Sequence, residues 1–222
     1  MDTRQLALWE LTSAGSEQSG RPAATWPGNA VLCQPLNLPD ADITYFPELF
    51  TKAESDRFFA SLLHTVHWRQ ETVCIAGKLV PLPRLTAWYG DRPYTYSGIT
   101  HPPSAWLPDL LLIKHRVEQV CQQQFNSVLL NLYRHGQDSV SWHSDDEAAF
   151  QENAAIASVS LGAIRKFMLK HTLQPSLRTS LELPHGSLLL MQGTTQKYWL
   201  HQVPKTRKAV TPRINLTFRQ LV

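Results

Sequence analysis

The run Arg213–Arg219 near the C-terminus constrains the fold of this chain more than any other stretch, because polar and apolar residues alternate along it. Such alternation predicts a β-strand with two different faces, and Ile214, Leu216 and Phe218 belong against a hydrophobic core. The other face carries Arg213, Asn215, Thr217 and Arg219. Guanidinium groups are costly to bury unless an anion lies against them. A dicarboxylate fits because guanidinium binds carboxylate in a bidentate fork; an edge strand with its polar face in water is the alternative.

The stretch Asn131–Asp145 begins like a strand and ends in a potential metal site. Asn131 and Tyr133 are two residues apart, so a strand would project both from one face. His143 and Asp145 have the same spacing, which lets an imidazole and a carboxylate reach one ion. With His201 as the candidate third ligand, they would form the two-histidine, one-carboxylate triad of non-haem Fe(II) oxygenases. The His-x-Asp motif alone is weak evidence for a metal site, since a solvated turn or a histidine oriented by the aspartate explains it equally well.

These motifs together resemble the AlkB family, whose members are Fe(II)- and 2-oxoglutarate-dependent dioxygenases that remove alkyl groups from nucleic-acid bases. The resemblance rests on Asn131-Leu-Tyr133, His143-x-Asp145, His201 and Arg213-x-Asn215-x-Thr217-x-Arg219 in this order and spacing. The segments 83–90, 94–97 and 143–147 are similar to the DNA-repair branch of the same family. The similarity covers about Asp40 to Val222, most of the chain.

The coarse pattern of elements predicts an α+β protein, with helices first and short strands afterwards. Thr51-x-x-Glu54 is a capping box that would open the first helix, and apolar residues recur at helical spacing over about 105–124. Strands are expected over 43–46, 128–134, 157–161, 166–171, 186–191 and 213–221. The resemblance implies a double-stranded β-helix, or jelly-roll, with helices packed on one sheet. We expect residues 1–39 to form a poorly ordered N-terminal arm and residues 40–222 the dioxygenase domain.

The resemblance also implies the site and its chemistry. Fe(II) would be held by His143, Asp145 and His201. The co-substrate 2-oxoglutarate would be bound by Asn131, Tyr133, Arg213, Asn215 and Arg219. Arg213 would pair with its distal carboxylate, and Arg219 would lie nearer the metal-bound one. With O₂, decarboxylation of 2-oxoglutarate would drive hydroxylation of the methyl group of 1-methyladenine or 3-methylcytosine. The methyl group would leave as formaldehyde; DNA is the expected substrate, and RNA stays open.

The base pocket is expected in an aromatic segment, because an enzyme that acts on a base draws it out of the stack and holds it between flat surfaces. The candidate substrate contacts are Arg84, Trp88, Tyr94, Tyr96, Asp146 and Glu147. The two acidic residues would contact the exocyclic amine of adenine or cytosine. The alternatives are that the aromatic side chains pack a sheet and that the acidic pair forms a solvated turn.

Charge and cysteine usage suit an intracellular protein that binds nucleic acid. The formal net charge is +3, and residues 1–40 hold four acidic against two basic side chains, so residues 41–222 carry +5. The three cysteines are widely spaced, which argues against a disulfide framework, and no run approaches the roughly 18 apolar residues of a membrane span. We expect a cytoplasmic monomer, or a nuclear one in a eukaryote. Without an obvious wedge for opening a duplex, single strands are the favoured partner.

Three other functions are compatible with parts of this pattern. A 2-oxoglutarate oxygenase acting on protein or lipid would share the site, but the aromatic and basic segment 84–96 favours nucleic acid. A zinc hydrolase could use the same three ligands. A nucleic-acid binding module without enzymatic activity would need only the basic surface. These last two leave Arg213 and Arg219 without a role.

Overall fold

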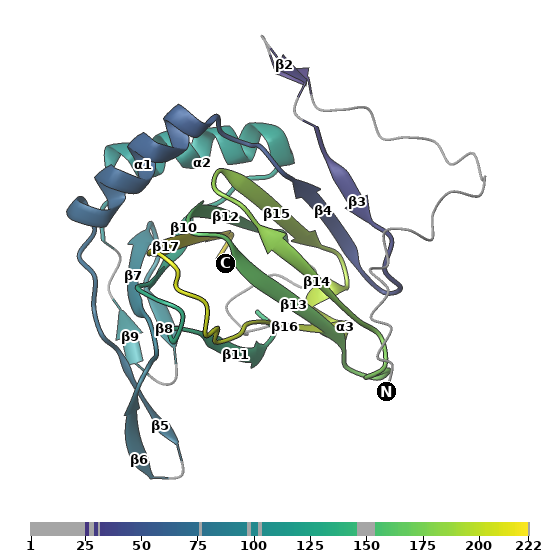
Figure 1. The fold of residues 1–222 in the computed structure, drawn as a ribbon. Helices are drawn as coiled ribbons and strands as arrows, with labels where there is room; N and C mark the ends of the chain where they lie inside the picture. Colours follow the sequence, from purple (N-terminus) through teal and green to yellow (C-terminus); the bar gives the residue numbers. More distant parts are fainter. Residues whose placement is uncertain are drawn as a thin grey trace.

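The computed structural model describes residues 32–75, 77–96, 99–101, 104–145 and 154–221, together with the strand residues 25–26 and 29–30. Two antiparallel sheets face one another, and two helices cover the outside of the larger sheet (Figure 1). Within the described ranges, no helix is long and apolar enough to cross a membrane.

The major sheet has seven strands in the order β3-β4-β15-β12-β17-β10-β7, all paired antiparallel. Their bounds are β3 Gln34–Leu36, β4 Asp42–Phe46, β7 Leu85–Gly90, β10 Ser127–Tyr133, β12 Ile156–Gly162, β15 Ser187–Gln192 and β17 Arg213–Arg219. The alternating strand β17 lies between β12 and β10 and is buried along its whole length. It is therefore a central strand and not an edge strand, so its polar face is enclosed by protein.

The minor sheet has four strands in the order β11-β16-β13-β14. Their bounds are β11 Val140–His143, β13 Arg165–His171, β14 Arg178–Leu183 and β16 Trp199–Val203, with the short helix α3, Thr195–Tyr198, before β16. Side chains from both sheets share one apolar cluster, in which Phe167 and Leu169 of β13 meet Leu189 and Met191 of β15. This cluster holds the two sheets together and leaves room for a cavity at one end.

Helices α1, Lys52–Thr65, and α2, Pro108–Cys121, pack on the outer face of the major sheet (Figure 1). The predicted capping box is present: Thr51 accepts from the main-chain N–H of Glu54, and the Glu54 carboxylate accepts from that of Thr51. The apolar residues of β17 lie in this layer with Leu62 and Val117. Because successive side chains of a strand point to opposite faces, the polar residues of β17 are directed between the two sheets.

Three two-stranded ribbons complete the described chain: β1, Thr25–Trp26, with β2, Asn29–Ala30; β5, Thr72–Ile75, with β6, Lys78–Pro81; and β8, Tyr94–Tyr96, with β9, Ile99–His101. The β5–β6 hairpin projects from the body of the molecule (Figure 1). Strand β3 belongs to the stretch that we assigned to the N-terminal arm, yet it pairs with β4. The described end of that stretch therefore joins the major sheet.

The expected fold class is confirmed: facing antiparallel sheets with helices on one of them form a jelly-roll core. The predicted helices and most predicted strands agree with the structure to within a few residues. Of the strands in the two sheets, β3, β7, β11, β14 and β16 were not predicted. The alternation in β14 is between exposed and half-buried positions, so its hydrophobic pattern is weak.

Candidate metal and co-substrate site

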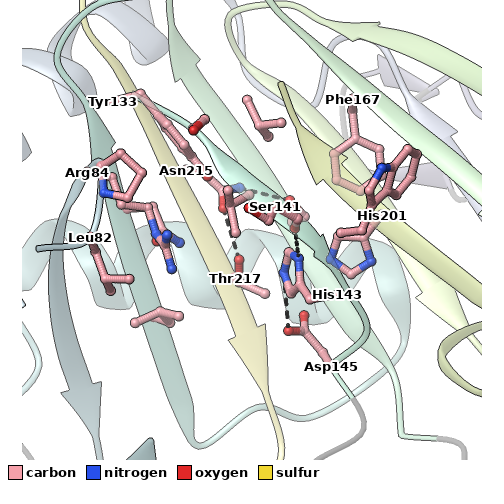
Figure 2. Close-up of a pocket in the computed structure, with 18 of the residues that line it drawn as sticks. Leu82, Arg84, Tyr133, Ser141, His143, Asp145, Phe167, His201, Asn215 and Thr217 are labelled. Atoms are coloured by element: carbon pink, nitrogen blue, oxygen red, sulfur yellow. Dashed lines mark hydrogen bonds and ion pairs between the residues drawn. The ribbon is translucent and has the colours of Figure 1, made fainter. Parts of the chain in front are cut away.

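A cavity of about 340 Å³ lies between the two sheets. Its walls come from β10 and β17 of the major sheet, β11 and β16 of the minor sheet, and the segment 80–84 at the base of the β5–β6 hairpin. Figure 2 shows the histidines and Asp145 at one side of this cavity and Tyr133 with Arg84 at the other. Its size is that of a small-molecule site.

Three candidate metal ligands come together at one side of the cavity. His143 of β11 and His201 of β16 are cross-strand partners, and their ring centroids are 4.2 Å apart. Nε2 of His143 lies 3.9 Å from Oδ1 of Asp145, and one ligand atom from each of the three residues lies within 4.8 Å of the others. Two imidazoles and one carboxylate at this spacing can hold a divalent metal on one face of the ion.

The two imidazoles are held in states that suit metal binding. Nδ1 of His143 lies 2.8 Å from the carbonyl oxygen of Ser141, which can only accept, so in the neutral tautomer Nδ1 carries the proton and Nε2 offers its lone pair. Burial, together with the nearby His143, lowers the pKa of His201 to about 3. His201 is therefore neutral at physiological pH, and its ring is stacked against Phe167.

Asp145 follows β11, and two contacts hold it in place. Its main-chain N–H donates to Oε1 of Gln196 in α3, and its Oδ1 lies 2.9 Å from Nη2 of Arg219. Burial alone would raise the pKa of Asp145, but the guanidinium of Arg219 and the two histidines hold this pKa well below its usual range. The carboxylate is therefore ionised, as a metal ligand must be.

Arg213 begins the polar face of β17 and is 1% exposed. Its Nη2 donates to Oγ of Ser160 at 2.9 Å. Within the described chain, its Nε and Nη1 have no hydrogen-bond partner. Burial is the main cause that lowers its pKa to about 10, so it stays charged at neutral pH. Arg213 is therefore a buried cation in the cavity wall with two N–H groups that lack an acceptor, and a carboxylate can bind both of them.

The other polar residues of the cavity form hydrogen bonds along the sheet. Asn215 donates from Nδ2 to Oγ of Ser158 at 2.8 Å, and its Oδ1 accepts from Thr217 at 3.0 Å. Asn131 faces Asn215 across the strands, and its Oδ1 accepts from Nε of Arg84 at 2.7 Å. The register likewise sets Tyr133 beside Arg213. All five predicted co-substrate residues therefore line one cavity.

The predicted base-pocket residues differ in their positions relative to the cavity. Arg84 lines the cavity and is 7% exposed. Trp88 does not line it: its Nε1 donates to the carbonyl oxygen of Arg92, and its ring packs with Leu221 beside Leu129. This packing corresponds to the alternative given above, in which the aromatic side chains pack against the sheet. The backbones of Tyr94 and Tyr96 form β8, but their side chains lie outside the described part of the structure. The residues Asp146 and Glu147 lie outside it altogether.

Several contributors to the site were not predicted. Ser158 and Ser160 support Asn215 and Arg213 from the neighbouring strand β12, while Gln196 holds Asp145. The position of the two serines could have been predicted from the sequence, because they alternate with apolar residues in the strand 156–162 and so share one face. The position of Gln196 could not, since α3 is only four residues long.

Comparisons with known proteins agree with this geometry. The family model described as "2OG-Fe(II) oxygenase superfamily" matches residues 42–219. Alpha-ketoglutarate-dependent dioxygenase alkB homolog 3 from Bos taurus is 45% identical over 175 residues, which are 75% of this chain and 61% of that protein. DNA oxidative demethylase ALKBH2 from Homo sapiens is 41% identical over 186 residues, covering 78% of this chain and 71% of that protein. The chain thus spans about three-fifths of the length of the bovine relative.

Among solved structures, one described as "The structure of OsALKBH1" superposes with a TM-score of 0.58 at 15% identity. The match covers 85% of this chain and 100% of that one, and it supports the jelly-roll fold. The superfamily model and the human relative each span most of the chain. The chain therefore belongs to the 2OG-Fe(II) oxygenase superfamily and, within it, to the AlkB family.

Proposed function

We propose that this protein is an Fe(II)- and 2-oxoglutarate-dependent dioxygenase that removes methyl groups from the nitrogen atoms of nucleic-acid bases. Its substrates would be 1-methyladenine and 3-methylcytosine in DNA. The observation that carries this proposal is the joint occurrence, in one cavity, of three metal ligands and a buried arginine with two unpartnered N–H groups. A zinc hydrolase would need the first of these features and would leave the second without a purpose.

The residues of the cavity fit both Fe(II) and 2-oxoglutarate. His143, Asp145 and His201 would hold Fe(II), and the iron with 2-oxoglutarate and O₂ would supply the oxidising chemistry. Arg213 would bind the distal carboxylate of 2-oxoglutarate through Nε and Nη1. Tyr133, Asn131 and Asn215 would hold the co-substrate in one orientation through neutral hydrogen bonds, and Arg219 would keep Asp145 ionised. The protein thus contributes positioning and electrostatics.

Alkylated DNA as the substrate is supported by the names of the relatives and by the position of Arg84. The human relative is named as a DNA oxidative demethylase. Arg84 lines the cavity beside Leu82 and the hairpin residue Val80, where a base drawn out of its stack would enter. Tyr94, Tyr96, Asp146 and Glu147 remain our candidates for further substrate contacts.

The test is release of succinate from 2-oxoglutarate by Fe(II)-loaded protein, with a 1-methyladenine or 3-methylcytosine oligonucleotide compared with its unmodified twin. We expect methyl-dependent turnover that is lost in His143→Ala. His115→Ala, which changes an exposed histidine on the outer helix α2, is the matched control and should retain turnover. Equal turnover with the methylated and the unmodified oligonucleotide would favour a protein or lipid substrate. Metal binding without any turnover would favour a zinc hydrolase.

The preferred strand form is a separate part of the proposal. We propose single-stranded DNA as the favoured partner, RNA as a further substrate, and action as an intracellular monomer. The modest positive charge of residues 41–222 supports a nucleic-acid partner. The same methylated sequence offered as single strand, duplex and RNA should give the highest kcat/KM for the single strand. A duplex preference would overturn this part and leave the dealkylase intact.

The domain division is also a proposal. Residues 40–222 would form the catalytic domain, in line with the family match over 42–219. Residues 1–39 would form an accessory arm whose end contributes β3 to the sheet. A chain shortened to residues 32–222 keeps β3 and should retain turnover if the preceding part of the arm is not needed for catalysis.

A further inference from the structure

Arg165, on the strand β13, is a second buried cation beside the co-substrate end of the cavity. It is 4% exposed, and its guanidinium carbon lies 5.7 Å from the centroid of the Tyr133 ring. The guanidinium carbon of Arg213 lies 5.3 Å from the same centroid. Two guanidinium groups thus lie over one tyrosine ring, although only Arg213 lines the cavity.

The guanidinium of Arg165 is held by main-chain carbonyl oxygens, and the charge of the nearby Asp138 carboxylate acts on it without direct contact. It donates to three main-chain carbonyl oxygens, those of His135, Asp138 and Pro204, at 3.3, 2.9 and 2.6 Å. In the described part of the chain, no ion pair joins it to a carboxylate. The nearby Asp138 carboxylate is bound by Arg134, at 2.8 Å to Nε and 3.0 Å to Nη2. Carbonyl dipoles satisfy N–H groups but leave the net positive charge in place.

The two cations act on each other. Burial lowers the pKa of both arginines, and the charge of Arg165 adds to this effect at Arg213. Two like charges held close together in a buried place repel one another. A dianionic ligand bound by Arg213 would relieve this repulsion, whereas a ligand with an uncharged end would not.

We propose that Arg165 is a positioning residue that sets the preference of this site for a dicarboxylate co-substrate by placing a second fixed positive charge behind Tyr133. The proposal rests on the function proposed above, since it names a determinant of the same 2-oxoglutarate site. Arg165 does not touch the ligand. It acts through the field at Arg213 and through the ring of Tyr133.

The test compares two acids that differ at one end. 2-Oxopentanoate has a methyl group where 2-oxoglutarate has its distal carboxylate. Their dissociation constants would be measured by calorimetry on Mn(II)-loaded protein without O₂, so that no turnover is needed. We expect Arg165→Gln to weaken 2-oxoglutarate binding about tenfold and to leave 2-oxopentanoate binding nearly unchanged. Arg165→Lys keeps the charge and should keep the ratio of the two constants within about threefold of the wild-type ratio.

Lys166→Gln is the matched control, because it removes one positive charge from the next residue of β13, which is exposed to solvent. Water screens that charge, so the ratio should not change. Equal weakening of both acids in the Arg165 variants would overturn the proposal, since that pattern indicates a purely structural role. An unchanged ratio in a folded Arg165→Gln protein would overturn it as well.

Two further outcomes are distinguishable. If Arg165→Gln does not fold, Arg165→Met takes its place: removal of the charge should again weaken 2-oxoglutarate binding relative to 2-oxopentanoate binding about tenfold, and an unchanged ratio of the two dissociation constants contradicts a role for the charge. If the wild-type protein binds no 2-oxoglutarate in the presence of Mn(II), the proposed function itself fails, and this inference fails with it. Binding by the wild type with no effect of Arg165 overturns the inference alone.

Discussion

At the scale of single residues, the site is governed by which charges are buried and what lies next to them. Asp145 is a nearly enclosed carboxylate, and its charge is maintained by the guanidinium of Arg219 at 2.9 Å. His201 is an enclosed imidazole, kept neutral by burial. A carboxylate that stays charged beside an imidazole that stays neutral is the combination that a divalent metal requires.

The role of Arg219 can be tested through the pH dependence of metal binding. In Arg219→Met the carboxylate of Asp145 loses the cation that lowers its pKa, so its pKa should rise. Metal binding requires the ionised form and should therefore be lost at a higher pH than in the wild type. At neutral pH we expect a roughly 10- to 100-fold lower affinity for Mn(II), as for other residues that orient a ligand. The measurement is a Mn(II) titration between pH 5 and 8.

Arg219→Lys is the control for this prediction. It retains a positive charge near Asp145 and should recover part of the affinity and of the pH profile. Equal pH profiles for Arg219→Met and the wild type would contradict the assigned role of the ion pair.

At the scale of elements, the loop between β10 and β11 connects the proposed co-substrate site to the base of the β5–β6 hairpin. The Asp138 carboxylate accepts from the main-chain N–H and the guanidinium of Arg134. Nη1 of Arg134 donates to Gln70, whose side-chain amide donates to the carbonyl oxygens of Leu82 and Arg84. A polar chain thus runs from the end of β10 to the segment that carries Arg84.

Asp138→Asn tests how much this loop contributes to stability. Burial raises the pKa of Asp138, but hydrogen bonds from Arg134 more than offset this and lower it overall. A carboxyl group whose folded pKa is depressed stabilises the protein above its unfolded pKa, near 3.9, and less so as the pH falls through the folded value. We expect the variant to lose about 1–3 kcal/mol of unfolding free energy at pH 7.

Urea denaturation at pH 7 and near pH 3 measures this contribution. The difference between Asp138→Asn and the wild type should shrink at the lower pH, because the carboxyl group of the unfolded chain is largely protonated below its pKa near 3.9. A difference that is constant across this range would show that packing, and not charge, is responsible.

The capping box of α1 offers a prediction that separates stability from activity. Thr51→Ala removes the side-chain acceptor of the Glu54 N–H. We expect a loss of about 1 kcal/mol in the free energy of unfolding. Helix α1 lies on the outer face of the major sheet, so KM for 2-oxoglutarate should not change. A changed KM would mean that this helix contributes to the cavity in a way that its contacts do not indicate.

At the scale of the whole molecule, the cavity joins the two sheets, and its ligands should therefore stabilise the entire fold. The proposed metal ligands lie in the minor sheet or, for Asp145, directly after its strand β11, and the proposed co-substrate residues lie in the major sheet. A ligand that binds only the folded state at 100 times its Kd adds about 2.7 kcal/mol. Mn(II) with 2-oxoglutarate should raise Tm in a concentration-dependent way.

Thermal unfolding of His143→Ala is the comparison for this effect. The variant should lose most of the shift produced by Mn(II), while Lys166→Gln should retain it. A wild-type Tm that does not respond to saturating Mn(II) and 2-oxoglutarate would contradict the assignment of the cavity.

The sequence by itself determined the elements whose periodicity is strong and the residues of the spaced motifs. Alternation identified β17 and its two faces, and the same spacing placed Asn131 with Tyr133 and His143 with Asp145. The capping box identified the start of α1. These predictions depend only on residues near one another in the chain, where the geometry of strands and helices is regular.

Only the tertiary structure decided which of these faces meet. It brought His201 across from His143 and set Arg219 against Asp145. It gave Arg213 a serine from β12 as partner, packed Trp88 against Leu221, and put Arg165 behind Tyr133. These contacts join residues that are distant in sequence, and no local pattern encodes the pairing of one sheet face with another. They depend on strand order and register, which the packing of the whole chain determines.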